Sequence, residues 1–201
     1  MNLRERRSST NEPAKIEVIV VGGGGHARVV IDTLRQLQRS QEHLVVLGYL
    51  DDKPGPEFKK NGQKSGVFGV PHLGTLAQWI DYPHAKFHLA IGNNIVRQQF
   101  VDKVGHERLF TIIHPTAFVS EFAIICCGCL IGANAVVNCD ASVGVASIVN
   151  SGAIVEHDAK IGNFVHLSYG SIVSGGGRVE DGVSLQPGAV VARNQSIKDS
   201  I

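Results

Sequence analysis

Aromatic residues make up only 6% of the 201-residue chain, and the charge is nearly balanced, with 19 Lys and Arg against 18 Asp and Glu. No basic cluster lies in the part expected to fold, which argues against a nucleic-acid partner. No apolar run approaches the roughly 20 residues of a membrane-spanning helix, which argues against membrane insertion. The polar N-terminus lacks the apolar segment of a signal peptide. We therefore expect residues 1–15 to be flexible and the protein to be cytoplasmic.

The sequence also offers no clear set of metal ligands. It has four cysteines, which lack the pairing of a zinc finger, and Cys129 occupies a position where the chain otherwise places small residues. In the second half, His157 and His166 provide only two imidazoles, and His114 lies far from them. Because catalytic zinc usually takes three protein ligands, we expect no metal site.

The strongest pattern present is an aliphatic residue at every sixth position from Ile113 to Ile197, fifteen in all. A helix cannot produce this period, whereas a β-solenoid does. A small residue usually follows four positions later, which suits a corner. Three hexapeptides make one triangular coil, with the aliphatic side chain inside. The sequence therefore predicts a β-solenoid of about five coils over residues 113–201.

The first half alternates strand-like apolar runs with helical patterns, which predicts an α/β domain with a parallel sheet over residues 16–112. The expected strands are Ile16–Val21, Leu44–Leu50, Lys86–Ile91 and Leu109–Ile113. One expected helix carries Val30, Leu34 and Leu37 on one face, and a second carries Val96, Phe100 and Val104 on one side.

A run of four glycines, Gly22–Gly25, joins the first expected strand to the first helix. Such a loop exposes backbone N–H groups at a helix N-terminus, which suits a phosphate or diphosphate. Its spacing resembles a dinucleotide fingerprint, but about 100 residues provide only half of a dinucleotide platform, so a single nucleotide fits better. The alternative, that the glycines serve only close packing, stays open.

Ligands of parallel sheets bind at the carboxyl ends of the strands. Polar residues follow the carboxyl ends of three expected strands. They are His26 after the glycines of the first, Asp51 and Asp52 after the second, and Asn93 and Asn94 after the third.

The repeat is interrupted where His157 lies between Glu156 and Asp158. It follows the inward Val155 by two residues, so its side chain should point out of the coil. A neighbouring carboxylate fixes the tautomer of an imidazole and stabilises its protonated form, as a general base requires. A solvated corner histidine is the alternative. His166, nine residues later, takes a slot otherwise filled by apolar or small residues, and packing or a catalytic role would both suit it.

Five motifs in order resemble the bacterial sugar O-/N-acyltransferases of the sialic acid O-acetyltransferase family. They are VVGGGGHARVV, LDD, IGNN, HPTA and EHDAKIGNFVHLSYGS, beginning at residues 20, 50, 91, 114 and 156. The sequence is most similar to the branch that N-acetylates nucleotide-linked 4-amino sugars in diacetamidobacillosamine-type pathways. The resemblance implies a Rossmann-like domain, a left-handed parallel β-helix and a homotrimer with the active site between subunits.

The resemblance also implies roles for individual residues. His157 matches the general base and Asp158 the carboxylate that orients it, while His166 and Gly175 match residues at the acetyl-CoA thioester. The segments implied to hold the nucleotide sugar contain Gly23, Gly24, Gly25, His26, Asp51, Asp52, Asn93 and Asn94. The chain departs from the family at Tyr169, where a small residue or proline is usual, and it lacks the usual C-terminal segment.

Together these features predict an acetyl-CoA-dependent N-acetyltransferase that acts on the 4-amino group of a nucleotide-linked sugar. Direct transfer is favoured over an acyl-cysteine route, because Cys139 should lie a full coil from His157. Two alternatives stay open. One is O-acetylation of a sugar hydroxyl, which the same base would serve, and the other is a non-catalytic, nucleotide-binding trimeric scaffold.

Overall fold

The computed structural model describes residues 14–53, 58–60 and 63–201. The predicted flexible N-terminus lies outside the described residues, except for Ala14 and Lys15. Within the described part, no helix is both long and apolar enough to cross a membrane.

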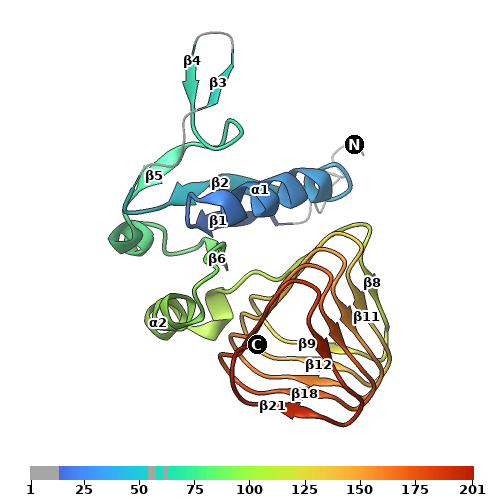
Figure 1. Ribbon diagram of the computed structural model, residues 1–201. Helices are drawn as coiled ribbons and strands as arrows, with labels where there is room; N and C mark the ends of the chain where they lie inside the picture. Colours follow the sequence, from blue (N-terminus) through green and yellow to red (C-terminus); the bar gives the residue numbers. More distant parts are fainter. Residues whose placement is uncertain (1–13, 54–57, 61–62) are drawn as a thin grey trace, which may run out of the picture.

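The first half of the chain folds around a parallel four-stranded sheet in the order β5-β2-β1-β6 (Figure 1). Its strands are β1 Ile16–Val21, β2 Leu44–Leu50, β5 His72–Gly74 and β6 Lys86–Leu89. Its helices are α1 Gly25–Gln38, α2 Asn94–Val104 and the 3-10 turns η1 Leu76–Asp81 and η2 His106–Arg108. A hairpin of β3 Phe58–Lys60 and β4 Gln63–Ser65 projects from the sheet. The Val- and Ile-rich β1 is central, and its last four residues are fully buried, as expected for a strand covered on both faces.

Two expectations for this half were wrong. The run at Leu109–Ile113 does not join the sheet as a strand, because Leu109 makes only an isolated bridge to Phe87 before the chain leaves for the solenoid. β5 takes the place of a fourth strand. Val96 is 38% exposed, and the buried side of α2 instead carries Asn94, Arg97, Phe100, Val101 and Val104.

The second half is a β-helix of fifteen two-residue strands in three parallel five-stranded sheets, as the hexapeptide period predicted. It is left-handed, as the family resemblance implied. The strands are β7 Ile112–Ile113, β8 Phe118–Val119, β9 Ile124–Ile125, β10 Leu130–Ile131, β11 Val136–Val137, β12 Ser142–Val143, β13 Ile148–Val149, β14 Ile154–Val155, β15 Lys160–Ile161, β16 His166–Leu167, β17 Ile172–Val173, β18 Arg178–Val179, β19 Ser184–Leu185, β20 Val190–Val191 and β21 Ser196–Ile197. Each strand residue pairs with the residue 18 positions away, and from β8 onward the second residue of each strand points into the coil.

The first domain packs on the sheet β19-β16-β13-β10-β7. The outward residues of this sheet, Ile112, Leu130 and Ile148, are buried in one cluster with Val30 and Leu34 of α1. The next outward residue in that row is His166, which pairs with Ile148. The docking of the two halves therefore brings His166 to their junction.

Candidate active site

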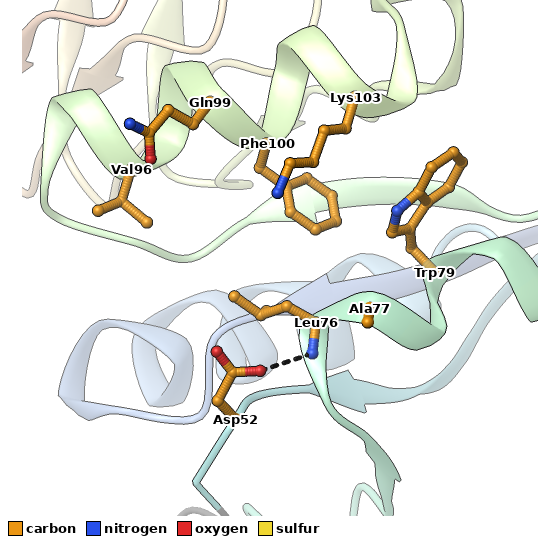
Figure 2. Close-up of a pocket in the computed structure, with 8 residues that line it drawn as sticks. All are labelled: Asp52, Leu76, Ala77, Trp79, Val96, Gln99, Phe100 and Lys103. Carbon is orange, nitrogen blue, oxygen red and sulfur yellow. Dashed lines mark hydrogen bonds between the residues drawn. The ribbon is translucent and has the colours of Figure 1, made fainter.

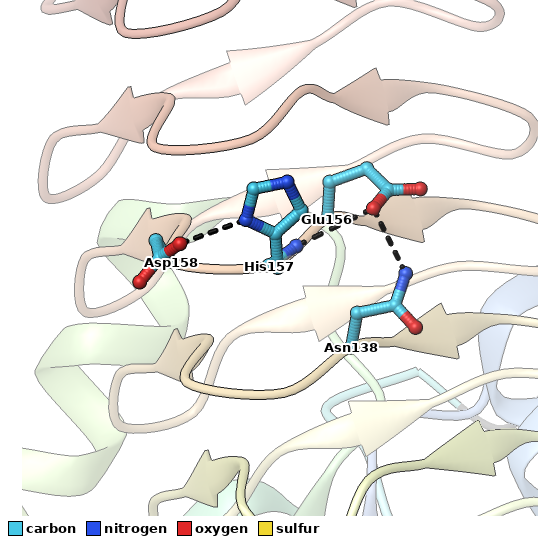
Figure 3. Close-up of polar contacts among 4 residues, drawn as sticks. All are labelled: Asn138, Glu156, His157 and Asp158. Atoms are coloured by element: carbon cyan, nitrogen blue, oxygen red, sulfur yellow. Dashed lines mark hydrogen bonds and ion pairs between the residues drawn. The ribbon is translucent and has the colours of Figure 1, made fainter.

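The turn after β14 presents His157 at the surface of the β-helix, beside two acidic residues (Figure 3). Its Nδ1 lies 2.7 Å from Asp158 Oδ2, and the two side chains are 50% and 65% exposed. Since an ionised carboxylate only accepts, Nδ1 carries a proton in this pair, and in the neutral imidazole the lone pair is then on Nε2. Asp158 thus orients an imidazole that can accept a proton at Nε2.

Glu156 supports the same turn from the other side. Its Oε2 accepts a hydrogen bond of 3.0 Å from Asn138 Nδ2, one coil below, and a longer one of 3.4 Å from the His157 backbone N–H. Asn138 was not singled out from the sequence, although its place 18 residues before Glu156 was a signal that could have identified it.

Gly175 lies one coil above His157. A Cβ added to this glycine would lie 2.8 Å from His157 Nε2 and 2.9 Å from Cε1. The same turn position holds Cys139, His157 and Arg193 in other coils, so the backbone there accepts a side chain. Gly175 is therefore suited to leave room for the imidazole. Within the described residues its N–H donates no hydrogen bond, so it is free to face a ligand beside Nε2.

His166 lies at the junction of the two halves. Its Nε2 is 3.3 Å from Asn150 Nδ2, and its ring centroid is 6.1 Å from that of His26. Burial, and secondarily Arg97, lower the pKa of His166, while a hydrogen bond to the Gly92 backbone opposes them. The structure thus brings together two predicted site residues from opposite halves, His26 and His166. Asn150 was missed because its contact depends on solenoid stacking.

His26 and His88 form a neutral pair beneath this junction. Burial lowers the pKa of His26 to about 3, and nearby His88, His166 and Arg97 act in the same direction. Burial also lowers the pKa of His88 to about 4, against a 2.8 Å hydrogen bond between its Nδ1 and the Phe110 carbonyl. Both imidazoles are therefore uncharged at neutral pH.

The four glycines divide into two pairs. A Cβ on Gly22 would lie 2.8 Å from the Ala90 carbonyl oxygen, and one on Gly23 would lie 2.7 Å from the Tyr49 ring, so packing alone requires these two. A Cβ on Gly24 or Gly25 would meet nothing within 4 Å. Gly24 is the N-cap of the 14-residue α1 and provides no side-chain cap. The open half of the loop therefore leaves helix N–H groups available to an anion.

The predicted aspartates are engaged by nearby backbone. Asp51 accepts hydrogen bonds from the N–H groups of Gly23, at 2.6 Å, and Lys53, at 2.8 Å. Asp52 accepts a hydrogen bond of 3.0 Å from the Leu76 N–H. It also borders a cavity of about 280 Å³ between η1 and α2. Figure 2 shows no hydrogen bond between the second carboxylate oxygen of Asp52 and the other lining residues, which include Trp79, Phe100 and Lys103. Asp52 is thus placed where a ligand could reach it.

The predicted asparagines serve the helix and the junction. Asn93 is the N-cap of α2, and its Oδ1 accepts from the Val96 N–H at 3.1 Å. Asn94 is buried, and its Nδ2 donates to the Gly182 carbonyl at 2.7 Å and to Ser184 Oγ at 3.0 Å. Their proposed contact with a nucleotide sugar stays a prediction.

The sequence and the fold are both similar to those of known acetyltransferases. Residues 17–104 match the PglD N-terminal domain family. The chain is 37% identical over 111 residues to UDP-N-acetylbacillosamine N-acetyltransferase of Bacillus subtilis, a match covering 54% of this chain and 47%, about half, of that enzyme. A histidine-to-asparagine mutant of perosamine N-acetyltransferase from Caulobacter crescentus, solved with CoA and GDP-perosamine, has a TM-score of 0.71 at 30% identity, with 90% of each chain covered. This chain belongs to the nucleotide amino-sugar acetyltransferase family.

A second structure supports the assignment of the fold. The acetyltransferase domain of PglB from Neisseria gonorrhoeae has a TM-score of 0.72 at 29% identity, over 88% of this chain and 91% of that one. Among the described residues of this family member, no group of three or more His, Cys, Asp or Glu side chains could hold a metal ion. Cys129 is buried, and burial raises the pKa of its thiol to about 12.

The neutral His88 makes stability depend on pH. In the unfolded chain a histidine binds a proton below about pH 6.5, whereas folded His88 stays neutral down to about pH 4. The free energy of unfolding is therefore not reduced by this histidine above pH 6.5. It decreases as the pH falls from 6.5 toward 4, because only the unfolded chain then binds the proton. At pH 5 the loss should be about 2 kcal/mol for this residue alone.

Urea unfolding at pH 7.5 and pH 5 measures this effect. His88→Asn, which keeps a donor near the Phe110 carbonyl but cannot titrate, should lose less stability between the two pH values than the wild-type protein does. Equal losses in the two proteins would show that His88 does not carry the effect.

Proposed function

We propose that the protein transfers an acetyl group from acetyl-CoA to the 4-amino group of a nucleotide-linked amino sugar. The observation that carries the proposal is the Asp158–His157 pair, in which Nε2 of the imidazole lies against Gly175. The relatives bound to CoA and GDP-perosamine support the substrate class. Residues 16–112 would hold the nucleotide sugar, and residues 113–201 would hold the acyl donor.

The transfer would be direct. The sugar amine attacks the thioester carbonyl carbon, and His157 Nε2 accepts a proton from the amine as the C–N bond forms. Asp158 stabilises the resulting imidazolium through Nδ1–H. The N–H of Gly175 would donate to the oxyanion. The C–S bond then breaks, and the proton passes from His157 to the sulfur of CoA, which restores the neutral base.

The phosphates of the nucleotide would bind at Gly24 and Gly25. These two glycines leave space over the uncapped N-terminus of α1, where backbone N–H groups and the helix dipole favour negative charge. His26 follows them directly and lies beside His166, so a ligand at the loop would extend toward the acyl donor.

A homotrimer would complete the site. The outward residues of the sheet β20-β17-β14-β11-β8 are all apolar: Phe118, Val136, Ile154, Ile172 and Val190. Phe118 and Val190 are 58% and 59% exposed. The other free sheet has the outward residues Ile124, Ser142, Lys160, Arg178 and Ser196, which are mostly polar. An apolar face of this kind is suited to a second copy, and His157 lies at its edge, so the site would lie between subunits.

A charge on this face tests the trimer. Val136→Asp, one coil below His157, should convert the trimer to monomers and lower activity by at least about 10²-fold, because an unpaired carboxylate would be buried at the interface. Ser142→Asp, the equivalent change on the polar sheet, is the matched control. Analytical ultracentrifugation measures the assembly, and a Val136→Asp protein that stayed trimeric and active would rule out this face as the interface.

The substrate is tested by measuring release of free CoA from acetyl-CoA with UDP-, dTDP- and GDP-linked 4-amino sugars and with free sialic acid. We expect release with at least one 4-amino sugar. Release only with sialic acid would support O-acetylation instead. Tight nucleotide binding with no release would support a non-catalytic scaffold. We also propose that the enzyme works in the cytoplasm, with these two soluble co-substrates.

A further inference from the structure

Arg97 of α2 is the largest fully buried side chain of the protein, among the residues that the structure describes, and is only 1% exposed. Burial lowers its pKa to about 10, so it stays protonated at neutral pH. A buried cation costs free energy unless its donors are all satisfied. Its placement therefore points to a specific task.

All five N–H groups of Arg97 have a partner. Nε donates to the Ala146 carbonyl at 2.7 Å. Nη1 donates to the carbonyls of Ile91, at 2.8 Å, and Gly92, at 3.3 Å. Nη2 donates to Asn94 Oδ1 at 2.8 Å and to the Val165 carbonyl at 3.2 Å. A guanidinium has five donors, and this set of oxygens uses every one.

These partners belong to both halves of the protein. Ile91 and Gly92 form the loop between β6 and α2, whereas Ala146 and Val165 lie at the same corner of successive coils. Asn94, which Arg97 holds, extends the contact to Gly182 on the next coil. One arginine and one asparagine thus bind the loop to three coils of the β-helix.

The contact is centred on His166. Val165, bound through its carbonyl, directly precedes His166 in the chain. Gly92, also bound, lies close enough to the His166 ring for its backbone to affect the pKa of that ring. Arg97 therefore holds both the backbone before His166 and the Gly92 backbone near its ring. The apolar contacts of Ile112, Leu130 and Ile148 with α1 already join the two halves, so adhesion alone would not require this cation.

We propose that Arg97 is a positioning residue of the acyl-transfer site, which fixes the His166 ring and the loop of residues 91–93 in one arrangement. The inference rests on the proposed function for its effect on catalysis. Its effect on His166 can be measured without turnover.

Arg97→Met removes all five donors at similar length, and Arg97→Lys keeps the charge with three donors. Because a shift of about 1 Å in a site can cost about 10²-fold, Arg97→Met should lower kcat by about 10- to 100-fold, while the KM for the nucleotide sugar changes less than about threefold. Arg97→Lys should recover part of that loss. If Arg97→Met does not fold, the lysine variant alone should still show a reduced kcat.

Arg108→Met is the matched control. Among the described residues, Arg108 donates to two first-domain carbonyls, those of Tyr82 and Ala85, and it covers the Phe87 ring. This change should lower the melting temperature but leave kcat within about twofold, since His166 is untouched. Assays run well below the melting temperature of every variant.

Ring-nitrogen NMR of His166, assigned by the loss of its signals in His166→Gln, gives the second readout. We expect the His166 ring of the wild-type protein to give the signals of one neutral tautomer. These signals should change in both Arg97 variants and stay unchanged in Arg108→Met. An unchanged His166 spectrum, with kcat no lower than in Arg108→Met, would overturn the inference. Absence of turnover in the wild type, with a changed spectrum in the Arg97 variants, would count against the proposed function and leave the positioning role intact.

Discussion

His157→Ala is expected to lower kcat by about 10²- to 10⁴-fold, the range typical for loss of a positioned general base. Nε2 of His157 is the ring nitrogen beside Gly175, while Nδ1 is held by Asp158 at 2.7 Å. Alanine removes the proton acceptor but leaves the coil intact, because the ring is half exposed and packs in no core. Affinity for acetyl-CoA should therefore change little.

Steady-state kinetics and calorimetric titration of CoA measure the two quantities. Cys139→Ala is the control at the equivalent turn position one coil below, where an exposed thiol could act only through an acyl-cysteine route. It should keep near-normal turnover. A His157→Ala protein with near-normal kcat would show that the base is misassigned, and an inactive Cys139→Ala protein would contradict direct transfer.

Gly175→Ala is expected to produce the second large effect. The new methyl carbon would lie 2.8 Å from His157 Nε2, closer than packed atoms allow, so the exposed imidazole must move. A displacement of about 1 Å in a catalytic group can cost about 10²-fold in rate. The fold should be almost unaffected, since other coils hold Cys, His or Arg at this position.

The separation of rate from stability is the diagnostic feature. Turnover should fall by about 10²-fold, whereas the melting temperature should shift by no more than a few degrees. A variant with normal turnover would mean that the imidazole moves during catalysis away from Gly175. A large loss of stability would mean that the glycine serves the backbone instead.

Much of the fold followed from the sequence because its signals are local. The six-residue aliphatic period predicted all fifteen short strands, and the stacking distance of 18 residues placed Cys139 one coil below His157. Gly175 was expected near the thioester only from the family resemblance, and its place above His157 comes from the structure. The strand at Leu109–Ile113 was predicted wrongly, since an apolar run does not show which sheet receives it. β5 is only three residues long and has no apolar run from which a strand could be predicted.

The junction could not be predicted in this way. Arg97 lies on a helix whose apolar spacing suggested a different buried side, and its partners Ala146 and Val165 are distant in sequence. Burial of Arg97 and Asn94 is favourable only when the two halves dock, because the β-helix then supplies carbonyl oxygens that accept their hydrogen bonds. The glycine loop was anticipated as a whole, but its division into packing and open residues depends on where Ala90 and Tyr49 lie.

The central claim is that the protein acetylates the nitrogen of a nucleotide-linked amino sugar. The most direct measurement is mass spectrometry of the nucleotide sugar after incubation with acetyl-CoA, followed by mild alkali. We predict a product one acetyl group heavier that survives alkali as an amide, formed by the wild-type protein and not detectably by His157→Ala in the same time. A product that loses its acetyl group in alkali, or no acetylated nucleotide sugar at all, would contradict the claim.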